Sequence, residues 1–205
     1  MAYCSATGTK TTRQALQKAG WRALAVATGH NWDSQPFLPY ALDNGAWSAH
    51  VNGKPFDVGA FERLLNWSGS CPVRPDWCVL PDIVGGGLKS LDFSLSWLDV
   101  VSKFSELNLL AVQDGMTPAD VDGLVGSGIG IFVGGSTEWK LKTLGDWGRF
   151  CRGRCYLHVG RVNTVRRITY CSNAGADSFD GTSVCRFPVN LGRLERARRQ
   201  QGFQF

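Results

Sequence analysis

The sequence has no apolar run long enough to span a bilayer, and its first residues lack the basic and apolar regions of a secretory signal peptide. We therefore expect a cytoplasmic protein with no membrane partner. No Gly-x-Gly-x-x-Gly loop opens the first strand–helix unit, which argues against a dinucleotide site. A Walker lysine and a nucleophile-elbow serine are missing too, so neither P-loop nor serine-hydrolase chemistry is indicated.

Paired cysteine spacings typical of metal sites are also missing. The 7 cysteines lie at positions 4, 71, 78, 151, 155, 171 and 185. Without a secretion signal, reduced thiols are favoured over a disulfide framework. Cys151, Cys155 and His158 could be drawn as a zinc site, but their spacing is not a standard one and His158 lies in an apolar segment. We expect neither a metal nor another cofactor.

What is present fits a single globular domain over 1–205, with 43% hydrophobic and 19% charged residues. The net charge is only +5, but arginines crowd the last third of the chain, and 188–205 is a basic C-terminal tail. Such a region suits a polyanion such as nucleic acid, although a solvated helix face with an arginine-rich tail has the same composition.

Short apolar segments alternate with segments of helical period along the chain. The expected strands lie in 21–28, 40–46, 77–84, 109–115, 128–135, 155–160 and 175–181, and the expected helices in 11–19, 57–67, 90–104, 136–150 and 164–174, with one more beginning at Thr117. This alternation predicts an α/β fold with a parallel sheet buried on both faces. About seven strand–helix units favour a compact (β/α)8 TIM-like barrel over a doubly wound sheet.

Polar residues gather where these strands end. The strand ends carry Asp43, Asp82, Gln113, Asp114, Gly134, Gly135, His158 and Asp180. In a barrel they would converge on one mouth, and the set is too polar for a core layer. Amides and backbone N–H groups suit a planar ligand such as a nucleobase, and two carboxylates facing a sugar C1′ suggest glycosyl chemistry. An aspartate that only caps a turn is the simpler interpretation of Asp180 taken alone.

Five segments, in order between Tyr40 and Thr182, resemble motifs of the tRNA-guanine transglycosylase superfamily. They are Asp43-Asn-Gly-Ala-Trp47, Pro81-Asp-Ile-Val84, Val112-Gln-Asp-Gly115, Phe132-Val-Gly-Gly135 and Gly175-Ala-Asp-Ser-Phe-Asp180. The resemblance implies a barrel that exchanges guanine in a polynucleotide for a 7-deazaguanine. It also implies that Asp180 is the nucleophile on C1′ and Asp43 the general acid and base, with Gln113 and the Gly134–Gly135 backbone binding the base.

Two departures from the family pattern bear on the substrate. No Cys-x-Cys-x-x-Cys…His zinc subdomain follows Asp180, and Gly85-Gly86-Gly87 stands where the family has an acid that reads the base, so that Asp82 or Asp114 would substitute. A compact chain without the zinc part resembles the phage branch, which inserts 7-deazaguanines such as 7-cyano-7-deazaguanine into DNA and so protects it from host restriction. The resemblance thus implies DNA and a 7-deazaguanine base as partners, in the host cytoplasm if a phage encodes the protein.

Several assignments stay open at this stage. His158 stands at a strand end with the base-binding residues, yet its apolar neighbours favour a buried structural histidine. Trp47, Tyr156 or Phe179 could sandwich the base, although each fits the core better. Arg161, Arg166, Arg167 and Arg186 are the expected phosphate contacts. Other substrates or roles also fit: tRNA or another RNA, an inactive nucleic-acid-binding barrel, or a nucleoside hydrolase.

Overall fold

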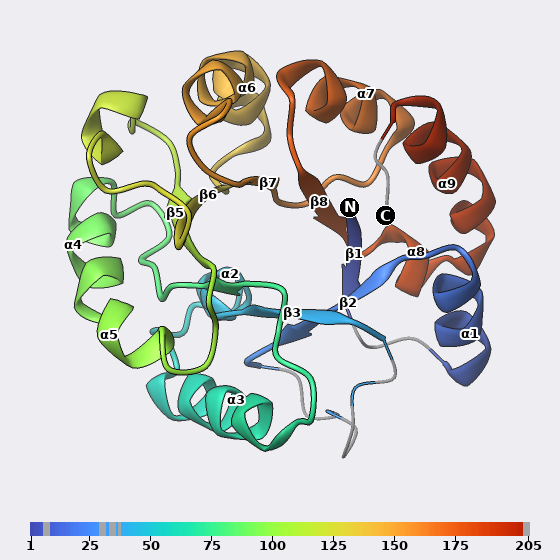
Figure 1. Ribbon diagram of the computed structural model, residues 1–205, viewed down its shortest axis with the longest axis horizontal. Coiled ribbons are helices and arrows are strands. Elements are labelled where there is room, and N and C mark those ends of the chain that lie inside the picture. The colour runs from blue at the N-terminus through green and yellow to red at the C-terminus, as the bar shows by residue number, and fades with distance from the viewer. Residues whose placement is uncertain (6–8, 29–31, 33–35, 37, 203–205) are drawn as a thin grey trace.

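The computed structural model describes residues 1–5, 9–28, 32, 36 and 38–202 (Figure 1). Over these residues, parallel strands β1 to β8 pair in sequence order and close into a barrel. They are β1 (Ala2–Ser5), β2 (Arg22–Val26), β3 (Tyr40–Asp43), β4 (Cys78–Val79), β5 (Asn108–Val112), β6 (Ile129–Val133), β7 (Leu157–Val159) and β8 (Ser178–Gly181). The predicted compact (β/α)8 barrel is therefore confirmed.

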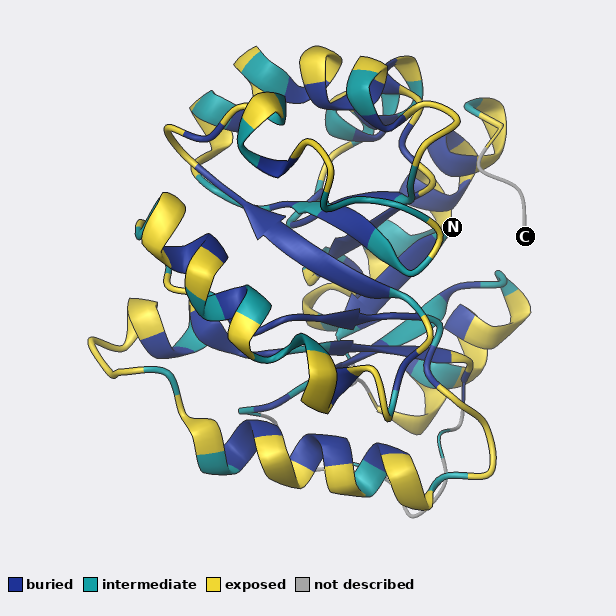
Figure 2. Cartoon of the chain, turned by 60° about the vertical axis from the view of Figure 1, so that its left-hand side comes forward, coloured by how far each residue is buried: buried dark blue, intermediate teal, exposed yellow. Residues whose placement is uncertain are grey.

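Helices surround the barrel and turn their buried faces toward the strands (Figure 2). They are α1 (Lys10–Lys18), α2 (Ala46–Val51), α3 (Val58–Ser70), α4 (Leu88–Ser96), α5 (Leu98–Val101), α6 (Thr137–Cys151), α7 (Val165–Ala174), α8 (Ser183–Arg186) and α9 (Leu191–Gln200), with single 3-10 turns η1 (Pro118–Val121) and η2 (Pro188–Asn190). Within the described ranges, no helix is both long and apolar enough to cross a membrane.

The sequence did not indicate β1, and this strand closes the barrel. Tyr3 is paired with Arg22 of β2 on one side and with Asp180 of β8 on the other. Four residues are too few for a periodic pattern, so only the pairing of its backbone on both sides identifies β1 as a strand. Its pairing with β8 places the N-terminus beside the strand that carries Asp180.

Several helices and strands are shorter than the sequence predicts. The expected helix 90–104 is divided at Trp97 into α4 and α5, and the helix expected from Thr117 is only the turn η1. The expected strand 40–46 ends at Asp43, because Gly45 adopts a left-handed φ of 79° from which α2 begins.

The described part of the basic C-terminal tail is ordered as η2 and α9. Leu194, Ala197 and Arg198 of α9 are buried, and Arg198 Nε donates to Glu195 Oε2 at 2.8 Å. Trp21 Nε1 donates to the same carboxylate oxygen at 2.7 Å. One face of this arginine-rich helix is therefore buried and does not extend into solvent, whereas Arg193, Arg196 and Arg199 are exposed.

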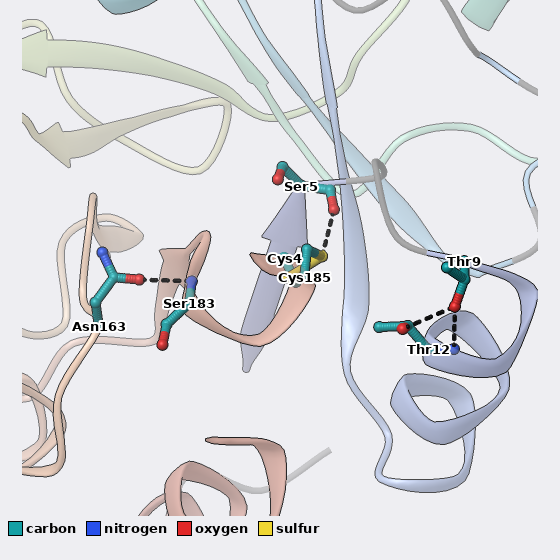
Figure 3. Close-up of a disulfide and its surroundings, with 7 residues drawn as sticks. All are labelled: Cys4, Ser5, Thr9, Thr12, Asn163, Ser183 and Cys185. Carbon is teal, nitrogen blue, oxygen red and sulfur yellow. Dashed lines mark hydrogen bonds between the residues drawn. A yellow bond between two sulfur atoms is a disulfide. The ribbon is translucent and has the colours of Figure 1, made fainter. Parts of the chain in front are cut away.

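The expectation of reduced thiols is corrected at one pair. Cys4 of β1 and Cys185 of α8 form a disulfide, although 181 positions separate them in sequence (Figure 3). Barrel closure brings β1 next to the chain that leaves β8, a proximity that sequence spacing does not reveal. The other cysteines are free. In the described part of the chain, no cluster of three or more His, Cys, Asp and Glu side chains is placed to hold a metal ion.

The barrel interior is filled from one end by apolar side chains that come almost entirely from the strands. They are Tyr3, Leu24, Ala41, Trp77, Val79, Leu109 and Ala111, with Phe132 and Tyr156 packed against them. Leu24, Val79, Ala111 and Phe132 also line a pocket at the other end. This inner cluster therefore forms the bottom of the pocket, and the polar residues at the strand ends lie above it.

Candidate active site

A pocket of about 150 Å³ opens at the carboxyl ends of the strands. Most of the predicted strand-end residues line it, namely Asp43, Asp82, Gln113, Gly134, Gly135 and Asp180. A cavity of this size holds a single aromatic ring such as benzene. The pocket is thus suited to a planar heterocycle, with any attached sugar and chain outside it.

Asp180 is held in a fixed orientation by residues of β7 and β8. His158 Nε2 lies 3.0 Å from Asp180 Oδ1, and His158 Nδ1 lies 2.7 Å from Ser178 Oγ. Ser178 and Asp180 alternate with Phe179, so both side chains point to the same side of the strand. The backbone N–H of Arg161 approaches both carboxylate oxygens, at 3.3 and 3.4 Å. Asp180 is therefore an oriented acceptor at the pocket wall.

His158 does not line the pocket and lies fully buried beneath Asp180. Burial lowers its pKa below the usual value, which favours the neutral ring. Because an ionised carboxylate can only accept, Nε2 then carries the proton and Nδ1 accepts from the Ser178 hydroxyl. The structural interpretation of His158 therefore fits its position better than direct contact with a base.

Asp43, the last residue of β3, has a different environment in the same pocket. Its Oδ1 accepts the backbone N–H of Gly45 at 2.7 Å. Burial, aided by the negative charges of Asp180 and Asp82, raises the pKa of Asp43 to about 7, although the bond from the Gly45 N–H opposes this shift. Asp43 can therefore hold a proton near neutral pH and exchange it with a ligand.

Asp82 is fixed by Asn44, a residue that the sequence prediction did not include among site residues. Asn44 Nδ2 donates to Asp82 Oδ1 at 2.8 Å and to the Leu80 carbonyl at 2.6 Å. Burial raises the pKa of Asp82 to about 6, although the bond from Asn44 opposes this shift. The position of Asn44 within the Asp-Asn-Gly segment was the signal that could have identified it.

Gln113 lines the pocket while its side chain also holds the neighbouring loop. Its Nε2 donates to the Ile83 carbonyl at 2.9 Å, and its Oε1 accepts the N–H of Gly85 at 2.5 Å. A primary amide has two N–H donors and two acceptor lone pairs. One donor and one acceptor of Gln113 remain for a ligand.

Asp114 follows Gln113 but lies outside the pocket lining. It accepts the backbone N–H and the hydroxyl of Ser136, both at 2.6 Å. Gly135 has a φ of 63°, and a Cβ there would lie 2.6 Å from Asp114 Oδ2. Asp114 therefore shapes the Gly134–Ser136 turn. Of the two acids predicted to read the base, Asp82 faces the pocket and Asp114 does not.

Arg161 and Trp47 meet across the pocket opening. The Arg161 guanidinium lies 3.8 Å from the centre of the Trp47 ring and donates to the Gly135 carbonyl. Trp47 is 44% exposed, so the core position expected for it is wrong, whereas Tyr156 and Phe179 are packed in the core clusters. Arg161 has a left-handed φ of 61°, a conformation that costs a non-glycine residue about 1–2 kcal/mol.

The four arginines expected to contact phosphates all lie in chain segments that follow the carboxyl ends of strands. Arg161 lies after β7, Arg166 and Arg167 lie in the first turn of α7, and Arg186 ends α8 after β8. Cations at a helix N-terminus oppose the helix dipole. The placement of Arg166 and Arg167 therefore costs stability that a bound anion would recover.

Lys140 of α6 is a buried charge near the site that the sequence did not reveal. Its Nζ donates to the carbonyl of Gly160, next to Arg161. Burial, together with the positive charge of Arg161, lowers its pKa to about 8. Nothing in the helical pattern of 136–150 distinguishes this lysine from its exposed neighbours, because its role depends on the packing of α6 against the β7 connection.

A larger hollow of about 960 Å³ lies beside α2 and the start of α3. Asp57 is the acidic residue among its described lining residues, and Asp57 caps α3 by accepting the N–H of Ala60 at 2.9 Å. None of the predicted strand-end residues lines this hollow. The smaller pocket, which gathers the carboxylates, is therefore the candidate active site.

Comparison with models of protein families and with curated protein sequences finds no match. Among solved structures, the chain is similar to the crystal structure of tryptophan synthase from M. tuberculosis in its open form with BRD0059 bound. The TM-score is 0.46 and the sequence identity 15%, over 93% of this chain and 64% of that one. The chain thus spans less than two thirds of that protein's length.

Proposed function

We propose that the protein is a DNA-guanine transglycosylase that exchanges guanine for a 7-deazaguanine through a covalent glycosyl-aspartate. The observation that carries the proposal is the contrast between Asp180 and Asp43 in one pocket. Asp180 is an oriented acceptor, whereas burial keeps Asp43 protonated up to about pH 7. Two carboxyl groups with separate roles are what double displacement at a sugar carbon requires.

In the first half-reaction, a carboxylate oxygen of Asp180 bonds to C1′ of the target nucleotide as the bond from C1′ to N9 of guanine breaks. The departing guanine takes the proton of Asp43. In the second half-reaction, Asp43 accepts the N9 proton of the incoming 7-deazaguanine. N9 of the 7-deazaguanine then bonds to C1′ as the ester bond between C1′ and Asp180 breaks. Two inversions at C1′ retain the β configuration.

The remaining pocket groups are complementary to the hydrogen-bonding edge of guanine. Ionised Asp82, oriented by Asn44, would accept from N1 and N2, and the free N–H of Gln113 would donate to O6. The pocket volume of about 150 Å³ supports entry of the base alone. The target nucleotide must therefore leave the base stack to be reached.

The assignment of DNA as the polynucleotide comes from the resemblance to the phage branch, and the arginines at the mouth support a polyanion of either kind. Arg166, Arg167 and Arg186 would contact phosphates on both sides of the target. Replacing guanine by 7-cyano-7-deazaguanine would alter the major-groove edge that restriction enzymes read, which is how the modification would protect DNA.

Nucleoside analysis by mass spectrometry tests this function. The protein is incubated with 7-cyano-7-deazaguanine and either DNA or tRNA, and each polymer is then digested to nucleosides. We expect a deoxy-7-deazaguanosine peak from DNA alone. A peak from tRNA alone would assign the protein to RNA, and the absence of a peak from both would contradict base exchange with this substrate.

A further inference from the structure

An exposed apolar segment follows the catalytic strand. Phe187 is 60% exposed and Val189 is 87% exposed, with Pro188 between them also exposed. We refer to these three residues as the α8 tip. Arg186 precedes the tip, and exposed Arg193 follows it. The α8 tip is therefore a small hydrophobic surface with a cation on either side in the sequence.

The α8 tip is held in place by bonds that do not bury it. The Phe187 N–H donates to the Ser183 carbonyl at 2.8 Å, and Asn190 Nδ2 donates to Ser183 Oγ at 2.8 Å. The Ser183 N–H donates to Asn163 Oδ1 at 2.9 Å, and Cys185 is bonded to Cys4 of β1 (Figure 3). These bonds hold the backbone around the α8 tip in place, while the apolar side chains of the tip stay exposed to solvent.

The position of the α8 tip relates it to the candidate active site. Thr182 lines the pocket, and α8 begins at the next residue. Asn190, directly after the tip, donates to the hydroxyl of Ser183, the residue that follows Thr182. Cys185, two residues before Phe187, is bonded to Cys4, and the next residue of β1, Ser5, also lines the pocket. Both contacts hold the α8 tip close to residues of the pocket rim, so duplex DNA bound over the pocket would lie beside it.

We propose that the α8 tip inserts into the base stack of duplex DNA, in the space vacated by the nucleotide that enters the pocket. Apolar side chains are used as such wedges between base steps, and arginines beside them contact the phosphates. The proposal rests on the proposed function, because it requires a nucleotide that leaves the stack. It identifies duplex DNA as a substrate that the protein itself can open.

A double variant, Phe187→Ser with Val189→Ser, tests the α8 tip. Exchange is measured on a duplex and on the same strand alone, because a single strand needs no wedge. We expect kcat/KM on the duplex to fall at least tenfold and kcat/KM on the single strand to change less than twofold. Val73→Ser, at a valine that is 57% exposed between α3 and β4, is the matched control and should leave both unchanged.

A second measurement does not depend on exchange. A 2-aminopurine beside the target guanine becomes fluorescent when the stack opens. We expect the wild-type protein to raise the fluorescence of the duplex and the double variant to bind without raising it. If the double variant loses kcat/KM equally on duplex and single strand, or raises the fluorescence of the duplex as much as wild type does, the proposed insertion of the α8 tip is wrong. A wild-type protein that opens the duplex without exchanging base would support the wedge and contradict the proposed function.

Discussion

His158 Nε2 lies 3.0 Å from Asp180 Oδ1, and the ring is anchored on its other nitrogen by Ser178 at 2.7 Å. Register pairs His158 directly with Ser178 across β7 and β8, so the three side chains form one buried line toward the mouth. A neutral histidine between a hydroxyl and a carboxylate fixes the direction of the carboxylate without adding a charge. His158 and Ser178 are thus positioning residues for the proposed nucleophile.

Ser178→Ala tests this positioning. Losing the hydroxyl frees the ring tautomer, so we expect kcat to fall about tenfold with KM nearly unchanged, because the Ser178 hydroxyl touches no substrate. Ser68→Ala is the control, since Ser68 is also buried and bonded, to Tyr40 at 3.0 Å, but lies away from the pocket. A similar loss of kcat in both variants, measured by steady-state exchange, would show that the effect is only one of packing.

The pH dependence of exchange should report Asp43 and Asp82. Proton donation to guanine needs protonated Asp43, so kcat/KM for DNA should fall above about pH 7. Acceptance of the N9 proton needs ionised Asp43 and recognition of N1 and N2 needs ionised Asp82, so kcat/KM for the incoming base should fall below about pH 7 and more steeply below about pH 6. Asp82→Asn should remove only the steeper fall below about pH 6 and keep the alkaline limb of kcat/KM for DNA. An alkaline limb that disappears with Asp82→Asn would contradict the assignment of Asp43.

The same raised pKa makes folding stability depend on pH. A carboxyl group whose pKa rises on folding favours the folded state at low pH, and that contribution is lost as pH rises through about 7. Asp43→Asn keeps an acceptor for the Gly45 N–H and removes the buried charge. We expect its melting temperature to exceed that of wild type at pH 8, by roughly 2–4 °C per kcal/mol, and to match it near pH 4. Thermal unfolding at the two pH values measures this.

The barrel and the identity of its mouth could be predicted because apolar strands and polar strand ends are local patterns. The sequence could not show which of Asp82 and Asp114 faces the pocket. Both residues follow strands, and the direction of each side chain depends on the conformation of the turn that holds it. Asn44 bonds Asp82 and Ser136 bonds Asp114, and neither contact is visible in sequence. Lys140 and the disulfide between Cys4 and Cys185 likewise depend on tertiary proximity.

Base recognition separates the same two acids experimentally. Asp82→Asn cannot accept two N–H groups as a carboxylate does, so we expect KM for 7-cyano-7-deazaguanine to rise about 10–100-fold, a cost of about 1.4–2.8 kcal/mol. Asp114→Asn should leave that KM within about threefold, because Asp114 contacts Ser136 and not the pocket. The reverse ranking in a titration of the free base would assign recognition to Asp114.

Salt dependence tests the arginines at the mouth. Arg166→Gln and Arg167→Gln should weaken DNA binding about equally for every sequence, and each should reduce the slope of log K against log salt by about one. Arg152→Gln serves as the control and should leave the slope unchanged, because Arg152 is exposed in the connection from α6 to the amino end of β7, opposite the carboxyl ends of the strands. An unchanged slope in both α7 variants, measured by fluorescence anisotropy, would exclude these side chains from phosphate contact.

The most direct test of the account is whether Asp180 carries the deoxyribose during exchange. The protein is mixed with a guanine-containing oligonucleotide, quenched in denaturant, and analysed by denaturing gel and peptide mass spectrometry. We predict a denaturation-resistant complex, linked at Asp180, that disappears when 7-cyano-7-deazaguanine is added and is absent from Asp180→Asn. Exchange of labelled guanine by Asp180→Asn, or linkage of the DNA to another residue, would contradict the mechanism.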